Sequence, residues 1–181
     1  MLEHGGALLA AAARYGIEPA GWLDLSTGIN PAGWPAPPVP AAVWQRLPEA
    51  EDGLVQAAAA YYGCSEVLPV AGSQAAIQTL PRLRAASRVG VPHPAYAEHA
   101  HAWRAAGHAV LAWDAAMGVE ALDVLVLVHP NNPGGQTYAA AELLDWHARL
   151  AARGGWLVVD EAFIDATPEA SLAGLCPRPG L

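Results

Sequence analysis

Two stretches decide the fold: Val126-Leu-Val-His-Pro-Asn-Asn-Pro-Gly-Gly135 and Trp156-Leu-Val-Val-Asp-Glu-Ala-Phe163. Each begins with consecutive apolar residues, as expected for strands of a parallel sheet that is covered on both faces. Each apolar run then gives way to polar residues, notably Asn132 in the first stretch and Asp160 in the second. Because ligands of such sheets bind beyond the carboxyl ends of the strands, we expect these polar groups to reach one crevice.

Around these stretches, helical and strand-like segments alternate along the chain. This alternation predicts an α/β fold with a mostly parallel sheet and helices on both of its faces. We expect helices over residues 6–15, 40–46, 53–62, 73–80, 96–106 and 139–153, and strands over 67–71, 88–91, 109–113, 124–128 and 156–159. Residues 23–27 are expected to be extended. Dense prolines predict a loop over residues 30–38. We therefore expect an amino-terminal arm over 1–38 and a main domain over 39–181.

Composition excludes several classes of function. The formal charge is −8, and the nine cationic residues are all scattered arginines, so no basic stripe is available for nucleic acid. The apolar runs are too short to cross a bilayer, and no secretory leader is recognisable, so we expect a cytoplasmic protein. We interpret Cys64 and Cys176 as reduced thiols, because their spacing fits neither a metal pair nor a disulfide framework. The histidines lack partners at ligand spacing, so we assign no metal.

Three strand ends carry candidate binding groups. Gly72, Ser73 and Gln74 precede or begin a helix, where backbone amides can bind a phosphate, although Gly-Ser before a helix is more often only a helix cap. Asn132 could have been selected by turn chemistry alone. Asp160 is harder to explain without a function, since an ionised carboxylate at the end of an apolar strand needs a cationic partner. A protonated pyridine nitrogen would be such a partner.

Together the motifs resemble those of the fold-type-I pyridoxal-phosphate enzymes, in the branch of histidinol-phosphate aminotransferase. The resemblance is carried by Gly72-Ser-Gln-Ala-Ala-Ile77, Pro94-Ala-Tyr-Ala-Glu98, His129-Pro-Asn-Asn-Pro-Gly-Gly135 and Val159-Asp-Glu-Ala-Phe-Ile-Asp165. Within that branch, His4-Gly-Gly6, Asp24-Leu-Ser-Thr-Gly-Ile-Asn-Pro31 and Asp160-Glu-Ala-Phe163 are similar to the threonine-phosphate decarboxylases of cobalamin synthesis. The domain over 39–181 would then be part of the large cofactor-binding domain, and the arm over 1–38 would contain a substrate loop.

The resemblance implies a role for each matching residue, with pyridoxal 5′-phosphate as the cofactor. Gly72, Ser73 and Gln74 would bind its phosphate, Tyr96 would stack on its ring, Asn132 would bond its phenolic oxygen, and Asp160 would pair with its ring nitrogen. Tyr96 and Asp160 would be the catalytic residues among these, although a core residue at a helix start is the alternative for Tyr96. His4 and Asn30 would hold the phosphate of the substrate, although a solvated histidine and a turn asparagine are common without function.

The function that the resemblance implies is decarboxylation of O-phospho-L-threonine to aminopropanol phosphate, in an enzyme that is a homodimer at full length. Phe163 favours this reading, because aminotransferases of the branch usually carry tyrosine at that position. The alternatives are an aminotransferase, such as one acting on histidinol phosphate, and a non-catalytic remnant that binds a ligand.

The chain contains no lysine. In the family, a lysine that follows the Asp160-Glu-Ala-Phe163 motif holds the aldehyde of the cofactor as a Schiff base. Here the sequence ends at Leu181, before that point and before the small carboxyl-terminal domain. We therefore expect the amino-terminal part of a longer enzyme, or a truncated gene product, that is inactive by itself.

Overall fold

The computed structural model describes residues 5–30, 32–47, 49 and 51–181. The chain divides into two compact units, over residues 1–48 and 49–181. The first unit contains helix α1 (Leu8–Tyr15) and two short 3-10 helices, η1 (Pro19–Gly21) and η2 (Ala41–Gln45). The second unit contains all the strands that the described residues form.

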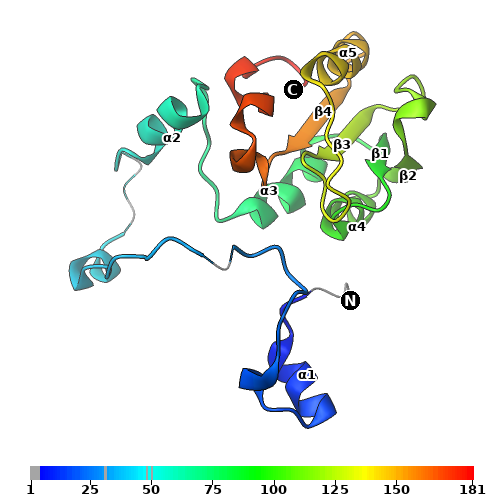
Figure 1. Ribbon diagram of the computed structural model, residues 1–181. Coiled ribbons are helices and arrows are strands. Elements are labelled where there is room, and N and C mark those ends of the chain that lie inside the picture. The colour runs from blue at the N-terminus through cyan, green and yellow to red at the C-terminus, as the bar shows by residue number, and fades with distance from the viewer. Residues whose placement is uncertain (1–4, 31, 48, 50) are drawn as a thin grey trace. The chain divides into compact units, whose positions relative to one another are not determined.

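The second unit is built on a four-stranded, wholly parallel sheet (Figure 1). Its strands are β1 (Arg88–Pro92), β2 (Ala109–Trp113), β3 (Val124–Val128) and β4 (Trp156–Asp160), in the order β2-β1-β3-β4. Its helices are α2 (Leu54–Tyr62), α3 (Ser73–Thr79), α4 (Ala97–Ala105) and α5 (Ala140–Ala151), with 3-10 helices η3 (Leu80–Leu83), η4 (Ala115–Met117), η5 (Ile164–Ala166), η6 (Pro168–Ala170) and η7 (Ala173–Leu175). The predicted parallel α/β fold is confirmed.

Strand β3 is buried along its whole length because its alternate side chains enter two different cores. Leu125 and Leu127 pack in a cluster with Leu143 and Leu150 of α5. Val124 and Val126, on the opposite face, belong to a cluster that contains Trp103 of α4. Helices therefore cover both faces of the sheet, which explains why β3 reads as an uninterrupted apolar run instead of an alternating one.

Close packing requires a glycine in the middle of β1. A methyl group added at Gly90 would collide with the end of the Leu122 side chain and would lie 3.2 Å from Cβ of Trp113. Leu122 and Trp113 are almost completely buried, so neither can move aside freely. Gly90 thus allows the segment before β3 to pack directly on the sheet.

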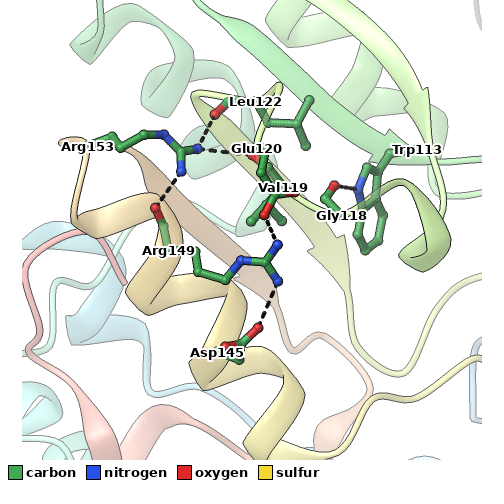
Figure 2. Close-up of polar contacts among 8 residues, drawn as sticks. All are labelled: Trp113, Gly118, Val119, Glu120, Leu122, Asp145, Arg149 and Arg153. Atoms are coloured by element: carbon green, nitrogen blue, oxygen red, sulfur yellow. Dashed lines mark hydrogen bonds and ion pairs between the residues drawn. The ribbon is translucent and has the colours of Figure 1, made fainter.

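Arg149 in the last turn of α5 and Arg153, two residues after its end, hold that same segment at the amino-terminal side of β3 (Figure 2). The guanidinium of Arg153 donates to the carbonyl oxygens of Val119 at 3.0 Å and Leu122 at 2.9 Å. It also donates to the carbonyl of Arg149, one turn earlier, at 2.7 Å. The side chain of Arg149 pairs with Asp145 and Glu120. Arg153 therefore supplies a donor to the carbonyl groups of Arg149 and Leu122, and a second donor to that of Val119, which also accepts the N–H of Leu122.

The strand predicted over 67–71 is wrong. This segment forms no strand, and no strand of the described chain pairs with it. Leu68 is 84% exposed, and Pro69 cannot donate to a ladder. Residues 23–27, expected from their sequence to be extended, also form no strand. Strand propensity without a neighbouring strand leaves the backbone unpaired. The helix predicted over 40–46 is likewise a shorter 3-10 helix.

Within the part of the chain that the structure describes, no helix combines the length and the apolar character needed to cross a membrane.

Candidate functional site

The order of the strands creates a crevice between the carboxyl ends of β1 and β3. The chain leaves β1 through α4, on one face of the sheet, and leaves β3 through α5, on the other face. Because β1 and β3 are neighbours, the two connections diverge from adjacent positions. Such a switch point is where open parallel sheets bind their ligands. The loops over residues 93–96 and 129–136 border it.

Asp160, the last residue of β4, is held next to this crevice by two contacts. Its Oδ2 lies 2.8 Å from Nε2 of His99, and its Oδ1 accepts the backbone N–H of Ala162 at 3.0 Å. Both side chains of the pair are largely buried, with 5% of His99 and 14% of Asp160 exposed. Burial alone raises the pKa of Asp160, but the hydrogen bond and charge of His99, with the N–H of Ala162, outweigh it. The pKa of Asp160 therefore lies below its usual value and the carboxylate is ionised at neutral pH.

His99 is a site residue that the sequence analysis missed. It lies three positions after Tyr96, and residues at that spacing share one face of a helix. Tyr96 caps the amino terminus of α4, and its ring packs edge-on to His99 with 6.2 Å between the ring centroids. This three-residue spacing is the sequence feature that could have identified His99 as a site residue. The helix thus directs Tyr96 and His99 to the same part of the crevice as Asp160.

The segment predicted to bind phosphate lies at the start of α3. Gly72 has a φ of 78°, a left-handed value that favours glycine, and Ser73 is the exposed first residue of the helix. The side-chain amide of Gln74 donates to the carboxylate of Glu98 in α4 at 2.9 Å. Since Glu98 precedes His99, the start of α3 is connected to the helix that contacts Asp160.

The loop after β3 contains two asparagines with different surroundings. Asn131 is buried, and its side-chain amide donates to the carbonyl of Pro94 at 2.9 Å and to Oε1 of Gln136 at 2.8 Å. Asn132, the residue predicted to bind the cofactor, is only partly buried. Backbone pairing between His129 N–H and Asp160 O, at 2.8 Å, joins this loop to the end of β4. Asn131 was not singled out by the sequence because it resembles any turn asparagine.

The remaining candidates lie elsewhere or outside the described residues. His4 is not among the described residues. Asn30 belongs to the 1–48 unit, where its side-chain oxygen accepts the N–H of Ala32 at 2.9 Å and closes a local turn. Phe163 follows β4 and is 41% exposed. Among the residues described, no group of three or more His, Cys, Asp or Glu side chains could hold a metal ion.

Fold and site together define a doubly wound α/β protein whose switch point presents an ionised carboxylate, an aromatic ring and a helix start. The model of the family "Aminotransferase class I and II" matches residues 48–179, which is nearly the whole second unit. The chain belongs to this family.

Two relatives in sequence are named threonine-phosphate decarboxylase. The protein from Pseudomonas aeruginosa is 60% identical to all of this chain, and the one from Sinorhizobium sp. is 48% identical over 96% of it. The alignments span 56% and 54% of those proteins, so the chain corresponds to about half of their length. A crystal structure of L-threonine-O-3-phosphate decarboxylase from Porphyromonas gingivalis matches with a TM-score of 0.54 at 23% identity, over 64% of this chain and 39% of that one. This last likeness supports the fold.

Proposed function

We propose that the chain provides the cofactor-binding part of a pyridoxal-phosphate-dependent carboxy-lyase acting on O-phospho-L-threonine, with aminopropanol phosphate as the product. The observation that carries the proposal is the ionised Asp160 carboxylate at the switch point, supported by His99. The names of the two sequence relatives support the choice of reaction.

The residues present fit this cofactor. A carboxylate can accept about four hydrogen bonds, and the described chain supplies two to Asp160, from His99 and Ala162. Capacity therefore remains for a protonated ring nitrogen. Gly72, Ser73 and Gln74 would hold the phosphate, Tyr96 would cover the ring, and Asn132 would bond the phenolic oxygen. When bound, pyridoxal phosphate supplies an electron-poor ring that stabilises the charge left on a substrate carbon after loss of carbon dioxide.

The roles of the chain's own residues follow from their charges. Asp160, kept ionised by His99, would hold the proton on the ring nitrogen, because an adjacent negative charge raises the pKa of a cationic acid. Asn132 would donate to the phenolic oxygen and favour its ionised form. His4 and Asn30 would bind the phosphate of the substrate and so distinguish it from unphosphorylated amino acids. We further propose a homodimer for the full-length enzyme and a location in the cytoplasm.

A second candidate is favoured by one observation, the absence of lysine from these 181 residues. Without that amine, the chain by itself would bind pyridoxal phosphate or a similar phosphorylated ligand without chemistry. An aminotransferase reaction is the other alternative, since the family model is that of the class I and II aminotransferases.

Titration of the purified chain with pyridoxal phosphate, followed by fluorescence or absorbance, tests the cofactor assignment. Asp160→Asn and Ser73→Ala should each weaken binding by about tenfold or more, since each removes an interaction with a charged group. Asp145→Asn, on the exposed side of α5, is the matched control and should bind like the wild type. Equal affinities for all four proteins would refute the assignment.

The substrate assignment needs a polypeptide that continues through the lysine-bearing segment of the relatives. There, Asn30→Ala and His4→Ala should raise KM for O-phospho-L-threonine and leave cofactor affinity nearly unchanged. Release of carbon dioxide measures the reaction. Formation of a keto acid in place of carbon dioxide would identify an aminotransferase.

A further inference from the structure

A side-chain amide spans the switch point. Asn131 lies in the loop after β3, and Pro94 lies in the loop after β1, so the 2.9 Å hydrogen bond between them crosses the crevice between the two neighbouring strands. Its backbone is fixed as well: Asn131 N–H donates to the carbonyl of Gln136 at 2.9 Å, and Asn131 O accepts from Gly135 N–H at 2.7 Å. Asn131 is 8% exposed.

The orientation of this amide is determined by its partners. The Nδ2 group has two hydrogens, and both face acceptor oxygens, the Pro94 carbonyl and Oε1 of Gln136. A reversed amide would place Oδ1 against both of these oxygens, which is unfavourable. Gly134 leaves room for this arrangement, because a methyl group added there would collide with the Gln136 amide.

The same bond closes a circuit of contacts around the crevice. From Pro94 the chain enters α4, where His99 contacts the carboxylate of Asp160 at 2.8 Å. The carbonyl of Asp160 accepts the N–H of His129 at 2.8 Å, and two residues later Asn131 returns to Pro94. The other links are helix α4, the hydrogen bond between His99 and Asp160, and the backbone bond from His129 to Asp160. The link across the crevice depends on the neutral side chain of Asn131.

We propose that Asn131 is a positioning residue, whose amide sets the separation between the loop that carries Asn132 and the loop that carries Tyr96. The effect on cofactor binding rests on the proposed function, in which Asn132 bonds the phenolic oxygen of the cofactor and Tyr96 covers the face of its ring. Asn131 itself does not touch the cofactor in this scheme. Loss of its amide allows the two loops to move apart, and the donor at Asn132 moves away from the phenolic oxygen.

The first experiment uses the chain with 4′-deoxypyridoxine 5′-phosphate, a cofactor analogue that has the ring and phosphate but no aldehyde. Asn131→Asp keeps the shape of the side chain but removes both donors. It should weaken binding of the analogue about tenfold. It should also raise the pKa of the analogue's bound phenol, read from its absorbance, because Asn132 no longer stabilises the ionised form and the new carboxylate adds a negative charge. Gln136→Ala adds no charge and retains the bond to Pro94, so the smaller rise expected there reports the position of Asn132 alone.

Two measurements separate positioning from general destabilisation. Arg153→Met weakens the opposite end of the sheet, away from the crevice. If it lowers thermal stability as much as Asn131→Asp does, it should still leave the pKa of the analogue's phenol unchanged. In the ligand-free chain, nuclear magnetic resonance should detect a coupling across the hydrogen bond from Asn131 Nδ2 to the Pro94 carbonyl. The signals of the Tyr96 ring and the Asn132 amide should shift in Asn131→Asp and less in Gln136→Ala.

The outcomes are distinguishable. If the wild-type chain binds no analogue, the proposed function fails, and the resonance data alone decide the role of Asn131. Asn131→Asp could instead lower thermal stability and change nothing at the site. If the resonance signals of Tyr96 and Asn132, the affinity for the analogue and the pKa of its phenol all stay as in the wild type, the positioning role is overturned.

Discussion

At the scale of single residues, Asp160 is the residue on which the proposed function depends most. The sequence predicted that a carboxylate ending an apolar strand needs a cationic partner, and that much could be inferred from the cost of burying charge. The structure supplies His99, which the sequence could not reveal because the pairing depends on how α4 crosses the sheet. Similarly, Cys64 and Cys176 are 112 positions apart, yet the Cys64 thiol lies 3.5 Å from the Cys176 carbonyl. Neither neighbour can be predicted from spacing.

The pair predicts a specific dependence of stability on pH. Because the pKa of Asp160 is lower in the folded chain than in the unfolded chain, the carboxylate stabilises the fold above its unfolded value of about 4. This contribution is lost as the pH falls through the lower folded value. Urea unfolding of the wild type and Asp160→Asn should therefore show a difference in free energy that shrinks as the pH falls from 5 to 3. A difference that does not change down to pH 3 would contradict the assigned direction.

At the scale of elements, the predictions succeeded where an apolar run has neighbours and failed where it has none. The strands from Arg88 onward lie in the sheet as expected, because each is flanked by another strand and covered by a helix. The segment 67–71 has similar residues and forms no strand. Local sequence reports the preference of a segment, whereas pairing depends on the rest of the fold. The same reasoning explains why the crevice could be placed from strand ends, but Asn131 could not.

The contact between α5 and the loop before β3 gives the prediction at this scale. Arg153→Met removes the donors to the Val119 and Leu122 carbonyls, so it should lower the free energy of unfolding by about 1–2 kcal/mol. Arg149→Met is the matched control, four residues earlier in the last turn of α5, and it removes only exposed ion pairs. It should cost less than about 1 kcal/mol. Chemical denaturation measures the free energy of unfolding of both variants. Equal losses of stability would show that the hydrogen bonds of the Arg153 guanidinium have no special role.

At the scale of the whole molecule, the second unit combines the family fold and the strand-end residues proposed to bind the cofactor with a sequence that contains no lysine. The sequence could identify this combination, because motif residues and missing residue types are both visible in one dimension. It could not place the 1–48 unit relative to the crevice, so the roles of His4 and Asn30 stay predictions.

We expect the 181-residue chain to bind pyridoxal phosphate weakly and without a covalent bond. The 181 residues contain no lysine, so no side-chain amine is present to form a Schiff base with the aldehyde. Borohydride treatment of the mixture followed by mass spectrometry should give no stoichiometric adduct. Decarboxylation of O-phospho-L-threonine should not exceed the rate with free cofactor. A stoichiometric adduct at one site, or a rate clearly above that background, would show that the chain is catalytically complete.

The switch point also has a consequence for the order of folding. The crevice lies between β1 and β3, but the chain forms α4 and β2 before it returns to place Val124 beside Val89 (Figure 1). Closing that long loop has an entropic cost that local helices do not have, so pairings of this kind form slowly. During refolding, helical circular dichroism should recover first and ligand-binding competence last. The site is then a product of the completed topology, and a partly folded chain would have helices without a place for the cofactor.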